Sequence, residues 1–524
     1  MSAKRVLFVA VSLLLTSAGQ ILSAESARRP KLVVAIMVDQ FRYDYLTRFR
    51  SEYHGGLDRL MTHGADFTNA FYEQVPTVTA VGHSIFMSGA MPAVSGIVGN
   101  SWYDRDEGKV VTSVCDWNVK LVGAPQSAEG PRCTDSDPAS PRRLLVSTIG
   151  DELRDVSEHS KVIGISIKPR GAILPSGHRA AGAFWFDDET GNFSSSTFYM
   201  DTLPAWAATF NERKLPDEYV SKKWEGFQQH DFHASPGQPK YSRLPASPWG
   251  NELIEAFSED AIRGEKLGQR GATDLLTISF SSNDYVGHAV GPDAPEVRDM
   301  SVRTDQLLDK LFQFIDSEIG LKDTLIVLSA DHGVAPLPAV DEADKMPGGY
   351  IAVDPEDAVE TALRSRFGTG EWVIAGAGET TLYLTRKKKG PSDAELYSVA
   401  REALFSTPLL HVARVYTRDE LDKGVTGDFI ARALMNGYYP RRSGDVFLIF
   451  EPNFMPGSGG TTHFSPYNYD THVPILFMGP GIKPGRYDER ITPNDIAPTL
   501  ATILSIQTPN GSSGRVLTEM LSER

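Results

Sequence analysis

The sequence predicts an α/β protein whose central, mostly parallel sheet is flanked by helices on both faces. Four short apolar runs support this prediction: KLVVAIMVD (31–39), KVIGISIK (161–168), TDLLTISFSS (273–282) and TLIVLSAD (324–331). They are rich in Val, Leu and Ile without polar alternation, which is typical of strands buried on both faces of a sheet. Apolar residues at helical spacing over 297–315 lie between the last two runs and predict a right-handed strand–helix–strand crossover.

The first 24 residues predict a secretory signal. Lys4 and Arg5 precede the apolar run VLFVAVSLLL, and small residues follow as far as Ala24. The alternative, an uncleaved membrane anchor, needs an apolar run of about 20 residues, and this run is shorter. We therefore expect 1–24 to be a cleaved signal peptide, the protein to be periplasmic or secreted, and the mature chain to have no membrane partner.

After the first strand, residues 41–64 show apolar side chains at helical spacing and predict a helical return to the sheet. The next stretch, 76–104, is rich in small residues and hydroxyls close to expected helix starts. Thr79 lies in this stretch, and a Thr at a helix N-terminus is more often a cap than a nucleophile. Thr79 alone therefore indicates no chemistry.

Two irregular segments predict insertions into one domain that spans 25–524. Residues 184–255 are rich in aromatic side chains and predict a cap over the edge of the sheet. Residues 345–440 mix short strands (WVIAGA, TTLYLT) with helical segments and predict a second insertion. The chain is then expected to return to the sheet with DVFLIF and VPILFMG.

Charge and cysteine content narrow the function classes. The 524 residues carry a formal charge of −15, which argues against nucleic acid or an anionic membrane as the main partner. An anionic substrate must then be held by local cations or metal ions. Cys115 and Cys133 predict a disulfide in an oxidising compartment, with two free thiols as the alternative.

Each of the four apolar runs ends in, or leads directly to, ionisable side chains: Asp39, Lys168 with Arg170, Asp284 with His288, and Asp331 with His332. A single Asp after a strand is more simply explained as a helix N-cap. Ligands of parallel sheets gather at the carboxyl ends of the strands, and carboxylates gathered there with imidazoles predict a divalent metal site. The two cations predict an anion clamp or an ordinary ion pair with a surface carboxylate.

The motifs, taken together and in order, resemble the alkaline phosphatase superfamily. After Asp39 they are T-x-T-A-x-G-H (77–83), G-I-x-G-N-x-W (96–102), S-I-K-x-R-G-A-I-L-P (166–175), S-x-x-D-Y-x-G-H (281–288), A-D-H-G (330–333), G-T-T-H (460–463) and Y-D-T-H-V-P (469–474). The chain is most similar to bacterial phosphate-irrepressible alkaline phosphatases with a threonine nucleophile, which are related to nucleotide pyrophosphatases/phosphodiesterases. The resemblance spans about residues 31 to 505 and implies the alkaline phosphatase-like fold.

The resemblance also implies the site. One zinc ion (Zn²⁺) is expected at Asp284, His288 and His463, and a second at Asp39, Asp331 and His332, with Thr79 as nucleophile beside it. Asn100, Lys168 and Arg170 match the residues that bind the phosphoryl group. Thr77 is the alternative to Thr79, and His472 is the alternative to His463. Phe464 departs from the Gly that commonly follows this His, and Mn²⁺ or Co²⁺ remains an alternative to zinc.

We therefore expect a zinc-dependent alkaline phosphatase that hydrolyses small-molecule phosphate monoesters through a phosphothreonine intermediate. Lys168 and Arg170 together suit the dianion of a monoester, whose three equatorial oxygens are charged. The alternatives are a phosphodiesterase or nucleotide pyrophosphatase of the same superfamily and a non-catalytic metal-binding pseudo-enzyme. A sulfatase is disfavoured, because neither cysteine lies in the C-x-P-x-R setting that such an enzyme needs.

Overall fold

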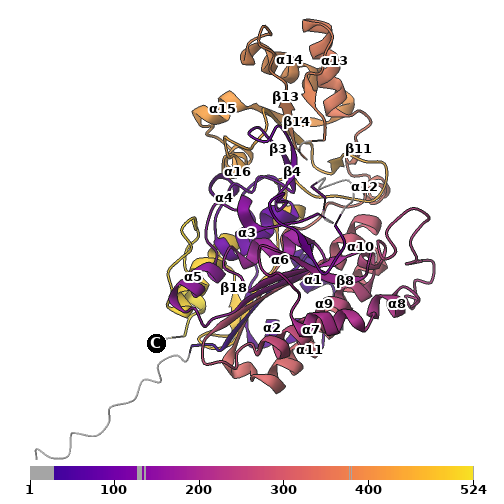
Figure 1. Ribbon diagram of the computed structural model, residues 1–524. Coiled ribbons are helices and arrows are strands. Elements are labelled where there is room, and N and C mark those ends of the chain that lie inside the picture. Colours follow the sequence, from indigo (N-terminus) through magenta and orange to yellow (C-terminus); the bar gives the residue numbers. More distant parts are fainter. Residues whose placement is uncertain (1–28, 127–132, 135–136, 377, 379, 523–524) are drawn as a thin grey trace, which may run out of the picture.

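The computed structural model describes residues 29–126, 133–134, 137–376, 378 and 380–522, so the predicted signal peptide lies outside the described residues. The largest element is a ten-stranded sheet in the order β18-β2-β17-β10-β1-β9-β6-β7-β8-β5 (Figure 1). Its strands are β1 (Leu32–Val38), β2 (Ala65–Phe67), β5 (Leu121–Val122), β6 (Val162–Ser166), β7 (Gly182–Asp187), β8 (Asn192–Ser196), β9 (Asp274–Phe280), β10 (Thr324–Ser329), β17 (Ile475–Met478) and β18 (Gly485–Tyr487). The five strands from β10 to β7 run parallel, which confirms the predicted α/β sheet.

Helices cover both faces of this sheet, as predicted. On one face, Leu32, Val34 and Ile36 of β1 pack in a core with α2 (Gly56–His63), α9 (Pro248–Glu265) and α11 (Pro295–Glu318). Val33, Ala35 and Met37 point to the other face, where α3 (Thr79–Ser88), α5 (Ile149–Val156) and α18 (Ile496–Leu504) cover them. Because β1 is buried on both sides, its sequence is apolar throughout instead of alternating.

The four apolar runs predicted as strands are β1, β6, β9 and β10, and they are neighbours in the sheet. β1 pairs with β9 on one side and β10 on the other, and β6 pairs with β9, all in parallel. Their carboxyl ends therefore meet at one edge. This edge receives the ionisable side chains that follow each strand.

The segment 184–255, predicted as a cap, begins inside the large sheet. β7 and β8 are two of its strands, paired antiparallel to each other. Phe184 and Phe193 do not cover the ligand edge, because both rings pack against Phe257 of α9 in the core. Aromatic content indicated buried contacts here, but it could not indicate which surface they would cover.

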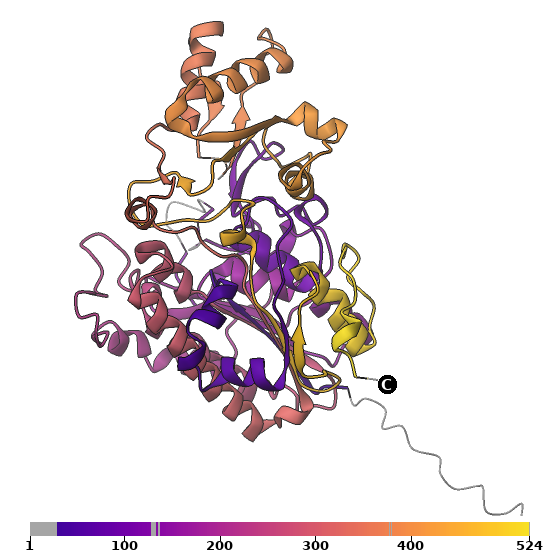
Figure 2. The same ribbon diagram turned by 180° about the vertical axis from the view of Figure 1, so that it is seen from behind.

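A second, four-stranded sheet stands above the large one (Figures 1 and 2). Its order is β12-β13-β15-β14, with β12 (Val373–Ile374), β13 (Thr381–Leu384), β14 (Val412–Thr417) and β15 (Val446–Phe450). The helices beside it are α13 (Pro355–Phe367), α14 (Asp393–Ser406), α15 (Arg418–Lys423) and α16 (Phe429–Gly437). The prediction that DVFLIF returns to the large sheet is wrong, because this run is β15 and pairs with β13 and β14. A buried apolar strand does not encode the sheet that it joins. VPILFMG does return to the large sheet, as β17, antiparallel to β10.

The remaining elements connect these layers. They are α1 (Tyr43–Arg48), α4 (Pro92–Ser95), α6 (Pro169–Ser176), α7 (Ala205–Glu212), α8 (Leu215–Tyr219), α10 (Ser282–Val290), α12 (Pro338–Ala343), α17 (Asn468–Thr471), the hairpin β3 (Ser101–Asp104) with β4 (Lys109–Thr112), and the pair β11 (Gly349–Tyr350) with β16 (Phe454–Met455). Cys115 and Cys133 form a disulfide across 18 residues. In the described ranges, no helix combines the length and apolar character that a bilayer crossing requires.

Candidate active site

Three neighbouring strands place most of the predicted metal ligands. Asp39 directly follows β1, and its backbone N–H donates to the carbonyl oxygen of Phe280 at the end of β9 (3.0 Å). Asp331 and His332 follow β10. The helix α10 starts immediately after β9, so that Asp284 and His288 lie one helical turn apart. His463 arrives from a loop far along the chain.

Asp39, Asp331 and His332, here called the Asp39 group, present ligand atoms that lie within 4.8 Å of one another. His332 Nε2 is 3.6 Å from Asp39 Oδ1 and 3.5 Å from Asp331 Oδ2. All three atoms are buried and have no hydrogen-bond partner among the described residues. Unpartnered buried polar atoms are costly, and three that converge with carboxylate and imidazole chemistry fit a divalent metal ion.

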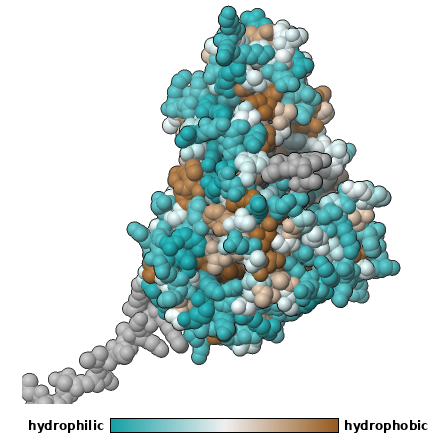
Figure 3. Space-filling view, in the orientation of Figure 1, coloured by the Kyte–Doolittle hydropathy of each residue, from teal (hydrophilic) through white to brown (hydrophobic). Residues whose placement is uncertain are grey.

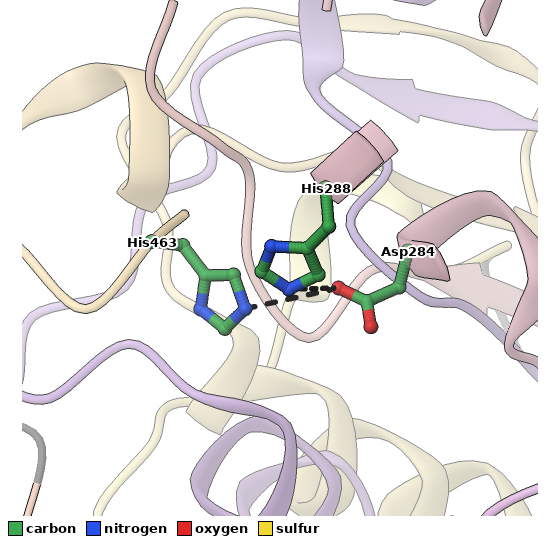
Figure 4. Close-up of side chains that lie close together, drawn as sticks. All are labelled: Asp284, His288 and His463. Atoms are coloured by element: carbon green, nitrogen blue, oxygen red, sulfur yellow. Dashed lines mark ion pairs between the residues drawn. The ribbon is translucent and has the colours of Figure 1, made fainter. Parts of the chain in front are cut away.

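Asp284, His288 and His463, here called the Asp284 group, also place their ligand atoms within 4.8 Å of one another. Figure 4 shows both imidazoles pointing toward the same carboxylate. Asp284 Oδ1 lies 3.1 Å from His288 Nε2 and 3.7 Å from His463 Nε2. The structure thus forms both predicted groups, each from the three protein ligands that the sequence assigned to it.

The three histidines are oriented in the same way. The Nδ1 atom of each donates a hydrogen bond to a backbone carbonyl oxygen: His288 to Thr461 (2.7 Å), His332 to Gly333 (2.9 Å) and His463 to Thr77 (2.7 Å). A carbonyl only accepts, so Nδ1 carries the proton and the lone pair of Nε2 faces the carboxylates. This is the arrangement by which proteins orient imidazole ligands of a metal.

Lys168 bridges the two groups. Its ammonium donates to Asp39 Oδ2 (2.7 Å) and to Asp284 Oδ2 (2.6 Å), one carboxylate from each group. The rings of His332 and His463 stack with centroids 3.4 Å apart, so the groups also touch on their imidazole side. The six predicted ligands therefore converge at one rim of the large sheet.

Burial and charge together set the protonation of this cluster. Burial and the neighbouring Asp284 and Asp331 carboxylates raise the pKa of Asp39 well above its ordinary value. Burial acts in the same direction on Asp284, but Lys168 and His288 outweigh it and hold the pKa of Asp284 well below its ordinary value. Burial lowers the pKa of His463, helped by the nearby His332. A neutral imidazole is the form that can bind a metal.

Thr79 lies beside the Asp39 group. It is the first residue of α3, the N-cap is Val78, and no hydrogen bond of the Thr79 hydroxyl is formed among the described residues, so the cap interpretation does not apply. A Cβ on Gly82 would lie 2.3 Å from the Asp331 carbonyl oxygen, so the first turn of α3 packs directly against that ligand. His83 Nδ1 bonds to the Thr79 carbonyl oxygen (2.9 Å) and lies 3.2 Å from Asp331 Oδ2.

The predicted phosphoryl-binding residues lie around the same point. Asn100 Oδ1 accepts from the backbone N–H of Ala80 (2.9 Å), next to Thr79. Lys168 is the N-cap residue of α6, and Arg170 is on the first turn of that helix. Burial lowers the pKa of Lys168, but Asp284 and Asp39 outweigh it and raise that pKa above its ordinary value. The Arg170 charge opposes this rise, so both cations share one electrostatic environment.

The structure distinguishes the two pairs of alternatives. The Thr77 hydroxyl donates to the carbonyl oxygen of Ser465 (3.0 Å). His472 stacks between Tyr43 and Phe71, and its Nε2 bonds to the carbonyl oxygen of Thr68 (2.9 Å). Thr77 and His472 therefore have structural contacts, and His463 is the histidine of its pair that belongs to the Asp284 group.

The loop after His463 keeps a glycine-like backbone. Phe464 has φ 139°, a conformation that favours glycine, and its ring packs against Phe450 of β15. Asp470 stabilises this loop, because its Oδ2 accepts from the backbone N–H of Phe464 (3.1 Å) and of Ser465 (2.8 Å) and from the Ser465 hydroxyl (2.6 Å). Burial raises the pKa of Asp470 to about 7.

Sequence reasoning missed the residues that hold the ligands. Gln40 contacts a carboxylate of each group, His83 lies behind Thr79, and Asp470 supports the His463 loop. Their signals were present but not used: Gln40 follows Asp39 directly, His83 ends the T-x-T-A-x-G-H motif, and Asp470 lies within Y-D-T-H-V-P.

Two buried carboxylate and imidazole groups at the strand ends fit the class of hydrolases that hold paired metal ions, and comparison with known proteins supports a hydrolase. The chain belongs to the type I phosphodiesterase / nucleotide pyrophosphatase family, which matches residues 33–472, within the alkaline phosphatase superfamily. It is 37% identical to alkaline phosphatase PhoV of Synechococcus elongatus, over 95% of this chain and 94% of that protein. It is 36% identical to alkaline phosphatase PafA of Elizabethkingia meningoseptica, over 94% of this chain and 95% of that protein.

Solved structures agree on the fold. The crystal structure of wild-type PafA superposes with a TM-score of 0.86 at 34% identity and covers 94% of this chain and 99% of that one. Murine ectonucleotide pyrophosphatase / phosphodiesterase 5 superposes with a TM-score of 0.54 at 14% identity, which shows a shared fold alone. The alkaline phosphatase-like fold that the resemblance implied is therefore confirmed.

Proposed function

We propose that this protein is a zinc-dependent alkaline phosphatase that hydrolyses phosphate monoesters through a phosphothreonine at Thr79. The observation that carries the proposal is the convergence of two three-ligand groups on Lys168, beside the first turn of α3. The identity of 36–37% to two alkaline phosphatases over nearly the whole chain supports it.

The Asp39 group and the Asp284 group would each hold one ion. Mixed carboxylate and imidazole ligands favour zinc. Bound zinc supplies Lewis-acid stabilisation of the attacking and leaving oxygens of an in-line phosphoryl transfer. The inward Nε2 atoms and the unpartnered Asp39 Oδ1 and Asp331 Oδ2 are the atoms that fit this role.

The chain's own residues would carry the covalent steps. Thr79 Oγ gives up its proton and attacks phosphorus, a new O–P bond forms, and the bond from phosphorus to the ester oxygen breaks, so that the ester oxygen takes up a proton and leaves as the alcohol. Water then cleaves the phosphothreonine, which returns the Thr79 hydroxyl and releases phosphate. Asn100, Lys168 and Arg170 would hold the non-bridging oxygens, whose charge must be stabilised throughout. A crystal structure of a PafA variant has a threonine, an asparagine, a lysine and an arginine replaced, the same residue types in the same order.

The cations favour monoesters. A monoester dianion presents more negative charge than a diester, and Lys168 and Arg170 share the phosphoryl end of the site. We expect two zinc ions per chain by elemental analysis, loss of activity on chelation, and faster hydrolysis of an aryl phosphate than of an aryl phosphodiester. Arg170→Ala should lower kcat/KM for the monoester by about 100-fold and for the diester by much less.

The rival proposal is a phosphodiesterase, favoured by the description of the family that matches 33–472. Equal losses for both substrates in Arg170→Ala, together with faster diester hydrolysis by the wild type, would establish it instead. A chain that binds two zinc ions but turns over neither substrate would be a pseudo-enzyme.

The proposal places the enzyme outside the cytoplasm after cleavage of 1–24. The disulfide between Cys115 and Cys133 supports an oxidising compartment. The N-terminal sequence of the exported protein tests this, and a retained Met1 would contradict it.

A further inference from the structure

Gln40 links the two ligand groups. Its backbone N–H donates to Asp331 Oδ1 (3.1 Å) in the Asp39 group, and its side-chain Nε2 donates to Asp284 Oδ1 (2.8 Å) in the Asp284 group. Asp39 is its neighbour in the chain, and Gln40 is 2% exposed. One residue thus touches the carboxylates of both groups and is joined covalently to a third.

The backbone of Gln40 is in an unfavourable conformation. Its φ is 61°, in the left-handed region, where a residue with a Cβ is sterically strained. Left-handed residues other than Gly, Asn and Asp persist where surrounding contacts fix them, and such strain concentrates at functional sites. In Gln40 this conformation lets the N–H and the amide reach two carboxylates at once.

The α10 helix is shaped to receive the amide. A Cβ on Gly287 would lie 1.9 Å from Gln40 Oε1, so only glycine permits this approach. Gly287 directly precedes His288, which places the Gln40 amide between Asp284 and the backbone that carries the next ligand. Lys168 donates to the other oxygen of Asp284, so the carboxylate accepts from Gln40 at Oδ1 and from Lys168 at Oδ2.

We propose that Gln40 is a positioning residue that orients Asp284 for metal binding and sets the Asp284 group in register with the Asp39 group. This inference rests on the metal binding of the proposed function and adds the residue that couples its two centres. Asp284 Oδ1 is the oxygen that faces both His288 and His463, so the amide fixes the rotation of the carboxylate at its ligand atom.

Zinc affinity of each group, measured separately, tests the inference. Gln40→Asn keeps an amide on a residue that tolerates the left-handed region, but it is one methylene shorter and withdraws from Asp284. In a His332→Ala background, which keeps all three ligands of the Asp284 group, Gln40→Asn should lower the zinc affinity of the metal-free protein about 10- to 100-fold, measured by calorimetric titration against the His332→Ala protein. In a His463→Ala background, the same change should lower zinc affinity less than about 3-fold, because the backbone N–H to Asp331 is kept.

Two further variants serve as controls. Gln74→Asn makes the same chemical change at the other fully buried glutamine, whose amide has no partner among the described residues, and should leave both zinc affinities unchanged. Gln40→Gly removes the amide while it relieves the backbone, and should reproduce the effect of Gln40→Asn in both backgrounds. Circular dichroism of each metal-free variant checks that it is folded.

The outcomes are distinguishable. Unchanged zinc affinity of the Asp284 group in the folded Gln40 variants, or equal losses in the two backgrounds, would overturn the inference and leave the proposed function standing. A wild-type chain that binds no zinc would overturn the proposed function and the inference with it.

Discussion

The two ligand groups are built from different kinds of structure. The Asp39 group comes from the ends of two adjacent parallel strands, and its three side chains are 0% exposed. The Asp284 group combines a helical pair with a histidine from a distant loop, and the His288 side chain is 35% exposed. One group is fixed by the sheet, whereas the other depends on contacts that arrive from elsewhere in the chain.

The two groups also differ in what holds their ligands in place. Backbone pairing of β1 and β10 sets the spacing of the strand-end ligands in the Asp39 group. The Asp284 group is held by Gln40, by the carbonyl oxygen of Thr77 that orients His463, and by Asp470 beneath the loop. We therefore expect substitutions near the two groups to have effects of different kind and size.

The largest expected effect is that of Thr79, the proposed nucleophile, which begins the helix packed against Asp331 of the Asp39 group. Thr79→Ala should lower kcat/KM by at least about 1,000-fold and abolish trapping of a phosphoenzyme, while two zinc ions remain bound. Thr77→Ala is the matched control on the side of the Asp284 group. It loses one hydrogen bond to Ser465, worth about 1 kcal/mol of stability, and should still form the phosphoenzyme. Normal turnover by Thr79→Ala would contradict the assignment.

The loop of the Asp284 group should make the stability of the protein depend on pH through Asp470. The pKa of Asp470 is raised by burial from 3.8 to about 7, so the folded protein binds its proton more tightly than the unfolded chain does. The stability that this residue contributes is fully present below pH 4 and is lost as the pH rises through 7. Asp470→Asn stays neutral, so its unfolding free energy relative to wild type should rise by up to about 4 kcal/mol between pH 4 and 8. Urea unfolding of the metal-free proteins measures this difference, and a constant difference across that range would refute the prediction.

The smallest expected effect compares one histidine from each group. His332→Ala should lower the unfolding free energy of the metal-free protein by about 2–3 kcal/mol, because it opens a cavity beside two buried carboxylates. His288→Ala should cost less than about 1 kcal/mol, since that side chain reaches solvent. Chelated samples followed by circular dichroism in urea give both values. Equal losses would remove the distinction between the groups.

Much of the site could be predicted because the residues that follow a buried strand can be identified from the neighbouring sequence. The runs that end at Asp39, Asp331 and Lys168 are buried on both faces, and their composition alone shows this. The helical spacing of Asp284 and His288 is equally local. The assignment of His463 as a ligand required the resemblance to a family, because the sequence of a glycine-rich loop does not indicate where in the fold the loop will lie.

The sequence by itself determined the parallel strands and the ionisable residues at their carboxyl ends, whereas the choice of His463 as a ligand and of Thr79 as the candidate nucleophile came from the resemblance to a family. Only the tertiary structure decided that β15 joins the smaller sheet, that Phe184 and Phe193 pack in the core, and that Gln40 joins the two groups. The physical reason is the separation along the chain between the residues that interact. Periodicity and chain-adjacent chemistry are written in neighbouring residues, whereas a hydrogen bond from Gln40 to Asp284, 244 positions away, exists only when packing has brought the two together.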